Sequence, residues 1–234
     1  MNIDKLSKRL ECVASYITKG MRIADIGSDH AYLPCYAVKR GVATTAIAGE
    51  VAEGPYQSAR QQVAVSDLDG LIEVRKGNGL AVIEPGEVDC VIIAGMGGAL
   101  ISEILESGKD KLSHVTRLIL QPNIAAANVR EWLLDNRWQL VNEQLIEEDG
   151  KIYEILVAER GDANHPYCDM KKELLLGPFL LRNKNEIFQK KWQQELDQWE
   201  KILVELEKAE KNPKTIEKQG ELNEKIQIVR GVLE

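Results

Sequence analysis

The chain has 234 residues, of which 44% are hydrophobic and 29% are charged, a composition typical of a globular domain with a smaller appendage. No apolar run approaches the roughly 18 residues of a membrane-spanning helix, and the N-terminal segment lacks the apolar core of a signal peptide. The four cysteines have no C-x-x-C spacing and no histidine pairs with them, so we expect reduced thiols, a cytoplasmic protein and no metal site.

The formal net charge of −7 disfavours a broadly basic nucleic-acid-binding surface. The charge is unevenly distributed, because residues 163–234 carry 13 Lys and Arg against 13 Asp and Glu. All of the excess negative charge therefore belongs to the first part of the chain. Any contact with a phosphate backbone must use local basic patches.

The N-terminal two thirds of the chain alternates between helical and strand patterns. Apolar residues at helical spacing predict a first helix over 3–19, closed by Gly20. Five short apolar runs then alternate with helical patterns; the runs are 21–27, 44–50, 71–77, 88–95 and 116–122, and the helices 32–41, 54–66, 98–108 and 125–136. Repeated strand–helix units predict a parallel sheet with helices on both faces.

The rhythm changes after the fifth strand. Residues 137–161 read as two strands joined by a turn at Asp149-Gly150, which is a hairpin signal. A nicotinamide-binding Rossmann domain would continue with a sixth parallel strand, whereas an S-adenosylmethionine methyltransferase sheet ends in a reversed strand. The pattern therefore favours an α/β, Rossmann-like class I S-adenosylmethionine methyltransferase fold.

A linker at 161–170 divides the chain into a domain at 1–160 and a second unit at 161–234. In the second unit, apolar residues recur every three or four positions on two charged helices separated by Asn212-Pro213; they are Phe188, Trp192, Leu196, Trp199, Leu203 and Leu206, then Ile216, Leu222, Ile226, Val229 and Leu233. This predicts a coiled-coil-like antiparallel helical hairpin. The pattern alone favours a hairpin that stabilises or dimerises the protein over an arm that grips a large substrate. It does not decide the oligomeric state, and a monomer is one alternative.

Polar or glycine-rich residues follow all five strands of the predicted parallel sheet. Ligands of such sheets bind at the carboxyl ends of the strands. The residues are Gly27, Ser28, Asp29 and His30; Glu50; Asn78 and Gly79; Gly95, Met96, Gly97 and Gly98; and Gln121 and Asn123. Each has a structural alternative, such as a tight turn, a surface carboxylate or, for Asp29, a cap of the helix that begins near Ala31. Their combination at five strand ends indicates a binding site.

The turn after the first strand also indicates which ligand binds. Asp25-Ile26-Gly27 opens like a nucleotide-binding turn, but Asp29 and Tyr32 stand where a dinucleotide fingerprint has glycines. S-adenosylmethionine has no phosphate and needs fewer close backbone approaches. Glu50, 25 residues past Asp25, is placed to accept both ribose hydroxyls. The segment therefore favours S-adenosylmethionine over NAD.

Five segments together resemble the bacterial tRNA adenine-N1-methyltransferases that modify adenosine 22, the TrmK family. They are DIGSDHAYLP, GEVAEGPYQSA, AGMGG, LILQPN and EEDGKIYEI, and the resemblance extends over the whole chain. One departure is Asn78, where the pattern has Gly-Asp-Gly; Asn can still accept from the adenine amine of the donor. The resemblance implies S-adenosylmethionine as methyl donor, tRNA as substrate, no metal, and an RNA-gripping role for the hairpin.

Site residues are assigned on these grounds. The donor site is expected to comprise Arg9, Asp25, Gly27, Ser28, Asp29, His30, Glu50, Asn78, Gly79, Gly95, Met96, Gly97 and Gly98. The pocket for the target base is expected to be lined by Asp29, His30, Gln121, Asn123 and Tyr153. Phosphate contacts are expected from Lys171, Lys172, Arg182, Lys184, Lys190 and Lys191, with Lys5, Lys8 and Arg9 on the first helix.

Three functions are compatible with these patterns. AGMGG occupies the position where amino-methyltransferases of this fold keep an Asn/Asp-Pro-Pro-aromatic motif, so methylation of an exocyclic amine is disfavoured and methylation of adenine N1 is expected. A second possibility is a methyltransferase for another RNA or a small molecule. A third is a non-catalytic nucleotide-binding module whose coiled coil recruits a partner.

Overall fold

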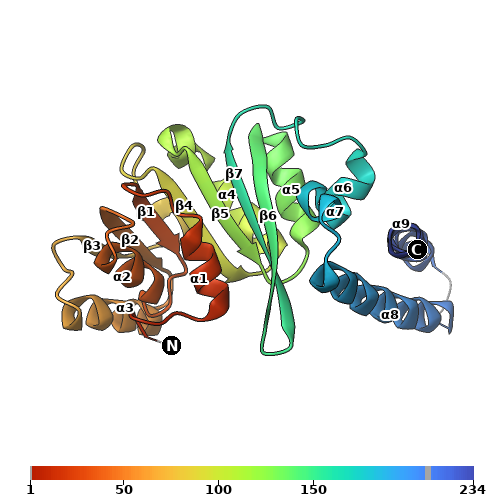
Figure 1. The fold of residues 1–234 in the computed structure, drawn as a ribbon, viewed down its shortest axis with the longest axis horizontal. Coiled ribbons are helices and arrows are strands. Elements are labelled where there is room, and N and C mark those ends of the chain that lie inside the picture. The colour runs from red at the N-terminus through yellow and green to blue at the C-terminus, as the bar shows by residue number, and fades with distance from the viewer. Residues whose placement is uncertain (1, 209–211) are drawn as a thin grey trace. The chain divides into compact units, whose positions relative to one another are not determined.

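The computed structural model describes residues 2–208 and 212–234. The chain folds as two compact units, Met1–Pro166 (unit 1) and Tyr167–Glu234 (unit 2) (Figure 1). Unit 1 holds the sheet and its covering helices, and unit 2 is helical. The sequence prediction divides the chain six residues earlier, at 160.

The predicted sheet is confirmed, and its strands are ordered β3-β2-β1-β4-β5-β7-β6. Strands β1 to β5 are parallel, and β7 runs antiparallel to both β5 and β6. The bounds are β1 Arg22–Ile26, β2 Thr45–Glu50, β3 Ile72–Lys76, β4 Cys90–Met96, β5 Arg117–Pro122, β6 Trp138–Glu148 and β7 Lys151–Arg160. The reversed final hairpin is the feature that distinguishes the methyltransferase sheet.

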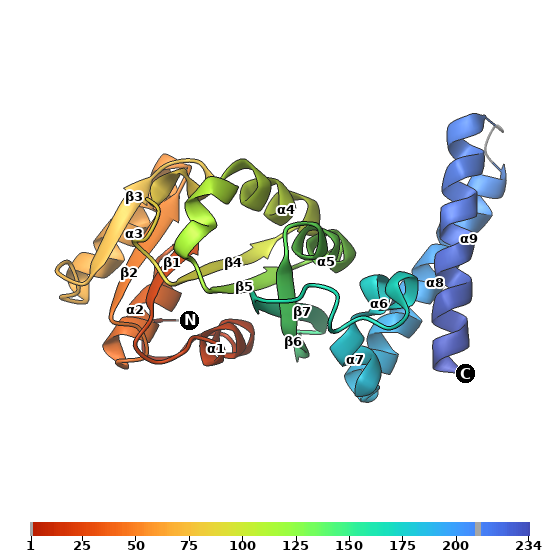
Figure 2. The same cartoon turned by 90° about the horizontal axis from the view of Figure 1, so that it is seen from above.

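Helices cover both faces of the sheet (Figure 2). One face carries α1 Lys8–Ser15, α2 Tyr32–Lys39 and α3 Glu53–Val65, and the other carries α4 Gly98–Ser107 and α5 Ala126–Asp135. Two 3-10 turns, η1 Gly79–Val82 and η2 Lys109–His114, precede β4 and β5. The central strands are buried over most of their length because helices shield both of their faces, which explains their continuous apolar sequences.

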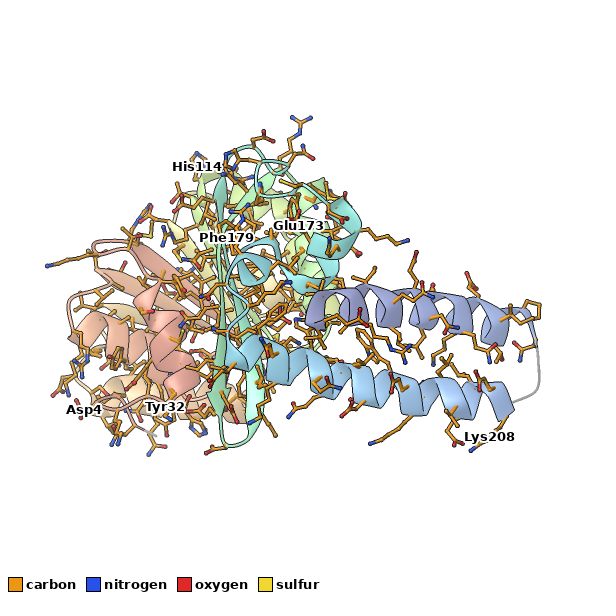
Figure 3. All side chains as sticks on the ribbon, turned by 45° about the vertical axis from the view of Figure 1, so that its right-hand side comes forward. Asp4, Tyr32, His114, Glu173, Phe179 and Lys208 are labelled. Carbon is orange, nitrogen blue, oxygen red and sulfur yellow. The ribbon has the colours of Figure 1, made fainter. Side chains whose placement is uncertain are left out.

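The parallel register brings the ends of the central strands to one edge of the sheet. Ile26 at the end of β1 is paired with Gly49 on one side and Ile93 on the other. In Figure 3, Tyr32, which follows β1, and His114, which precedes β5, mark the opposite edges. All five predicted strand-end segments therefore share the edge marked by Tyr32.

The first helix is shorter than predicted, because hydrogen bonds to two side chains close a turn before it and set the residue at which it begins. The Asn2 side chain accepts hydrogen bonds from the amides of Asp4 and Lys5 at 3.0 and 2.9 Å, closing a turn before the helix. The hydroxyl of Ser7 then accepts from the amide of Leu10 at 3.3 Å, so the helix begins at Lys8. Leu6 and Ile17 lie outside the helix and are nevertheless buried.

Unit 2 contains the predicted helical hairpin, formed by α8 Glu186–Lys208 and α9 Pro213–Leu233. Phe188, Trp192 and Leu196 on α8 and Ile226 and Val229 on α9 are buried. The Asn212 side chain caps α9 by accepting from the amide of Thr215 at 3.0 Å. Two further helices, α6 Met170–Leu176 and α7 Pro178–Arg182, were not predicted, because each has too few turns to display a 3.6-residue period.

Candidate functional site

The turn after β1 is closed against the end of β2. The amides of Gly27 and Ser28 both donate to the carbonyl oxygen of Gly49, at 2.9 and 3.3 Å. Gly27 has a φ of +72°, and a Cβ atom there would lie 2.2 Å from the methyl carbon of Met96. The left-handed backbone conformation therefore favours glycine at this position, whereas the Met96 methyl, at the end of a flexible side chain, could move aside.

Two buried carboxylates lie at the ends of β1 and β2. Asp25 and Glu50 are each 5% exposed. The hydroxyl of Ser28 donates to Asp25 at 2.6 Å, and Glu50 accepts from the amide of Asp29. Such a pair suits a ligand that carries a cationic amine and hydroxyl groups, because both groups donate to carboxylate oxygens.

Burial changes the protonation of both carboxyl groups. It raises the pKa of Asp25 to about 7, although the hydrogen bond from Ser28 opposes the rise; the neighbouring Glu50 adds to it and the Arg9 guanidinium opposes it. Burial also raises the pKa of Glu50, and the Asp29 amide opposes that change. Burial therefore disfavours the charged forms of both carboxyl groups, and a cationic ligand would favour them.

Asp29 and His30 project from the same turn. Asp29 and Ala31 both have left-handed backbone conformations, with φ of +58° and +52°. Helix α2 begins at Tyr32, and no side chain caps it, so Asp29 is not its cap. The Asp29 carboxylate lies 3.7 Å from Nε2 of His30, whose ring stacks on Tyr32 with 5.3 Å between ring centres. Both side chains are exposed at the carboxyl edge.

A second group of polar side chains forms after β4 and β5. Gln121 is fully buried, and its Oε1 accepts from Nη1 of Arg9 at 2.5 Å and from the amide of Gly95 at 3.0 Å. Its Nε2 donates to Oδ1 of Asn123 at 3.2 Å, and Nδ2 of Asn123 donates to the Gly95 carbonyl at 2.7 Å. Four of the predicted site residues, Arg9, Gly95, Gln121 and Asn123, are thus joined by hydrogen bonds.

Arg9 lies between the two groups. Besides its bond to Gln121, its guanidinium lies 5.3 Å from the centre of the Tyr153 ring on β7, and its charge acts on Asp25. The sequence places Arg9 on the first helix but gives no signal for these partners, since they are brought together only by the fold. Arg9, on α1, therefore interacts with residues of β1, β5 and β7 at the same edge of the sheet.

The AGMGG segment packs tightly against the loop after β5. The amide of Gly98 donates to the carbonyl of Ile124 at 2.9 Å, and a Cβ atom at Gly98 would lie 2.0 Å from the Ala125 carbonyl oxygen. Any larger residue would push the two loops apart. Gly98 is therefore required for this close packing, and the amide of Asn123 donates to the Met96 carbonyl at 2.7 Å beside it.

The end of β3 is more open. Asn78 is exposed, and its side chain does not cap η1, which begins at Gly79 with a φ of +54°. Both residues line a cleft of about 420 Å³ between η1, α4 and η2; its other lining residues are Leu80, Ala81, Leu100, Glu103, Ile104, Ser107, Gly108, Asp110 and Lys111. The structure does not bring Asn78 into the hydrogen-bonded groups described above.

Three apolar side chains were missed by the sequence analysis. Val51, Leu100 and Ile124 follow β2, β4 and β5 and are 64%, 47% and 73% exposed. Large apolar residues at successive strand ends are the signal that could have identified them. They supply apolar surface at the edge that holds the polar groups.

Within 2–208 and 212–234, no three or more His, Cys, Asp and Glu side chains are arranged to hold a metal ion. The same residues include no helix that is long and apolar enough to span a membrane.

Comparisons with known proteins identify the family of the chain. The profile of the TrmK family, described as tRNA (adenine(22)-N(1))-methyltransferase, matches residues 23–231. A protein of that name from Bacillus subtilis is 51% identical over 236 residues, covering 100% of this chain and 99% of its own. The crystal structure of the B. subtilis m1A22 tRNA methyltransferase TrmK superposes with a TM-score of 0.93 at 50% identity, covering 99% of this chain and 100% of its own.

A Streptococcus pneumoniae protein, described as a putative tRNA (m1A22) methyltransferase, was solved in complex with S-adenosyl-L-methionine. It superposes with a TM-score of 0.87 at 44% identity and covers 98% of this chain and 100% of its own. A profile match over most of the chain and relatives of this identity over its full length establish the kinship. The chain belongs to the TrmK family of tRNA (adenine(22)-N(1))-methyltransferases.

Proposed function

We propose that this protein transfers the methyl group of S-adenosylmethionine to N1 of adenosine 22 in tRNA. The single observation that carries the proposal is the juxtaposition of a buried carboxylate pair, Asp25 and Glu50, with the amide chain of Gln121 and Asn123 at one sheet edge. The first suits the donor and the second a purine base. Family membership supplies the substrate and the position.

The residues present fit the donor. Glu50 uses one carboxylate oxygen for the Asp29 amide and so retains an oxygen for the ribose hydroxyls. Gly27 leaves no side chain between this turn and Met96, so the backbone can approach a ligand closely. When bound, S-adenosylmethionine supplies a methyl group on a positively charged sulfur, which the two carboxylates would attract.

The target adenine needs positioning more than acid–base chemistry. N1 carries a free lone pair and requires no proton removal before it attacks, so orientation and exclusion of water supply most of the rate. Asn123 offers a hydrogen bond to the base edge, and Ile124 and Tyr153 offer surface for its ring. Asp29 adds a negative charge near the product, which becomes cationic on methylation. The base must leave its stack to enter, at a cost of a few kcal/mol.

We assign tRNA binding to the region 161–234, which includes unit 2. Lys171, Lys172 and Lys184 gather beside the C-terminal part of α9: Lys171 pairs with Glu224, Lys172 pairs with Asp169 at 3.0 Å, and Nζ of Lys184 donates to the Val232 carbonyl at 3.1 Å. A cavity of about 340 Å³ lies between the start of α6 and the C-terminal part of α9. These cations are exposed and able to exchange their protein partners for phosphates. We also propose a cytoplasmic location, which a tRNA substrate supports.

The test is incubation of the protein with labelled S-adenosylmethionine and unmodified tRNA, followed by mapping of the methylated nucleoside. We expect 1-methyladenosine at position 22 and no product on a tRNA carrying guanosine there. Methylation at another position or on another RNA would favour the broader methyltransferase alternative. Donor binding without transfer to any RNA would favour the non-catalytic module.

A further inference from the structure

We infer that Asn123 selects the target base, with its side-chain carbonyl accepting a hydrogen bond from the exocyclic amine of adenine, and that Arg9 and Gln121 fix the orientation of that carbonyl. The inference rests on the proposed function. It assigns separate tasks to three residues: Asn123 contacts the base, and Arg9 and Gln121 are positioning residues.

The orientation of the Gln121 amide follows from its partners. Nη1 of Arg9 and the backbone amide of Gly95 can only donate, and both face the same atom of Gln121, at 2.5 and 3.0 Å. That atom must therefore be the carbonyl oxygen, Oε1. The amine, Nε2, is then directed to Asn123, 3.2 Å away. Because Gln121 is fully buried, reversing its amide would leave two donors facing an amine without compensation from water.

The orientation of Asn123 is fixed from two sides. It receives a donor from Gln121 on one side, and on the other it faces the Gly95 carbonyl, which can only accept, at 2.7 Å. Oδ1 must point to Gln121 and Nδ2 to Gly95. Among the described residues, Oδ1 accepts this one hydrogen bond and retains a second lone pair, and the side chain is exposed at the site.

This remaining lone pair discriminates between bases. Adenine presents an amine next to N1, the atom to be methylated, and that amine can donate to Oδ1 while N1 stays free. Guanine presents a carbonyl oxygen at the same position, and two acceptors would then face each other. The exposed Ile124 follows Asn123 directly and provides apolar surface for the face of the same base. The hydrogen bonds that link Arg9, Gln121 and Asn123 thereby fix an acceptor that selects adenine.

The test compares two substrates with each enzyme: unmodified tRNA with adenosine at position 22, and the same tRNA with purine riboside there, which keeps N1 and lacks the amine. Single-turnover methylation rates give an adenosine-to-purine ratio for the wild type and for Asn123→Ala. We expect the ratio to fall by about fivefold or more in Asn123→Ala, as expected for the removal of one hydrogen bond. The lower intrinsic reactivity of purine N1 cancels, because it enters both ratios.

Two further variants isolate the positioning residues. Gln121→Glu keeps an acceptor for Arg9 and Gly95 but places a carboxylate oxygen against Oδ1 of Asn123, so the Asn123 carbonyl should lose its fixed position and the ratio should fall as in Asn123→Ala. Asn128→Ala, at an exposed asparagine on α5, is the matched control and should keep the wild-type ratio. A poorly folded variant slows both substrates alike and leaves its ratio interpretable.

The outcomes separate the two proposals. If the wild type fails to methylate the adenosine-containing tRNA, the proposed function is wrong. If it does so but Asn123→Ala keeps the full ratio, Asn123 does not contact the amine and this inference is overturned. A fall in Asn123→Ala without a fall in Gln121→Glu would retain the contact and overturn the positioning role of Gln121.

Discussion

Glu50, at the end of β2, accepts a hydrogen bond from the backbone amide of Asp29, in the turn after β1. This bond ties together the ends of β1 and β2, which form part of the proposed donor site. It occupies one oxygen of the buried carboxylate and so fixes the direction of the other. Glu50 therefore has a structural role besides the ligand-binding role proposed for it, and the two can be separated by substitution.

Glu50→Gln and Glu50→Ala should weaken binding of S-adenosylmethionine to different degrees. Glutamine keeps a single acceptor oxygen, which can still receive the Asp29 amide. Alanine has none, so it leaves both the ribose hydroxyls and the amide unpaired. We expect a loss of about 1 to 3 kcal/mol in Glu50→Ala and a smaller loss in Glu50→Gln, measured by calorimetry. The control is Glu53→Ala, at an exposed residue that pairs with Lys76. Unchanged affinity in a folded Glu50→Ala protein would remove Glu50 from the donor site.

The raised pKa of Asp25 predicts a stability that depends on pH. Burial raises this pKa to about 7, well above the roughly 3.9 of an unfolded aspartate, so the folded state binds more protons between these values. The contribution of Asp25 to stability is full below about pH 4 and is lost as pH rises to about 7. Asp25→Asn removes this titration and still accepts from Ser28.

Urea unfolding of the donor-free protein between about pH 5 and 8 tests this expectation. The wild type should lose stability relative to Asp25→Asn as the pH rises. Asp69→Asn, an exposed site, serves as control and should follow the wild type. Parallel curves for the wild type and Asp25→Asn would show that Asp25 does not titrate in this range.

The sequence predicted the strands and their ends because both are local. A continuous apolar run such as 90–93 and the polar residues that follow it are visible without the fold. Partnerships across the chain are not. Arg9 and Gln121 are 112 positions apart, and only the sheet order brings them within 2.5 Å. The same holds for Arg130 on α5, which lies between Glu143 on β6 and Glu154 on β7 and was not predicted.

Arg130→Ala should destabilise unit 1 strongly. Its guanidinium is 0% exposed and lies 2.6 Å from Glu143 and 2.5 Å from Glu154, so the substitution would leave two carboxylates buried without their cation. Removing one partner of a buried pair costs about 3 to 5 kcal/mol. Arg230→Ala is the matched control, since Arg230 also lies 2.6 Å from a glutamate but is 55% exposed.

The expected loss of stability in Arg230→Ala is below about 1 kcal/mol, because water screens exposed pairs. Both values come from urea titrations of the full chain. Equal losses in the two variants would contradict the role assigned to burial. Because Glu154 neighbours Tyr153 on β7, a folded but weakened Arg130 variant should also methylate tRNA more slowly.

Substituting the three lysines beside α9 should weaken tRNA binding and make the affinity less dependent on salt concentration. The triple variant Lys171→Ala, Lys172→Ala, Lys184→Ala removes cations that can bind phosphates, so the slope of log affinity against log salt should flatten by about one for each phosphate that is no longer bound. Donor affinity should stay the same. The control variant substitutes Lys208, Lys214 and Lys218, at the other end of the hairpin, where Figure 3 labels Lys208. An equal effect of both triple variants would indicate general electrostatics instead of a local site.

Asp29→Asn should leave the fold intact and slow methyl transfer. The structure excludes capping of α2 by Asp29, and asparagine tolerates the left-handed conformation at this position nearly as well as aspartate does. The substitution therefore removes a charge and little else. In the proposed site, the donor sulfur and the methylated product both carry positive charge, which the Asp29 carboxylate would stabilise. We therefore expect transfer to slow at least about tenfold, roughly 1.4 kcal/mol in the barrier.

The affinity for S-adenosylmethionine, measured on the same Asp29→Asn protein, distinguishes a role of Asp29 at the donor from a role at the adenine. A parallel loss of affinity would place the carboxylate at the donor, and unchanged affinity would place it toward the adenine. Asp67→Asn is a suitable control, because Asp67 also has a left-handed backbone, with a φ of +54°, but lies after α3, away from the strand ends. Full activity in Asp29→Asn would mean that the carboxylate has no part in the reaction, and the left-handed turn would then be the reason for an aspartate there.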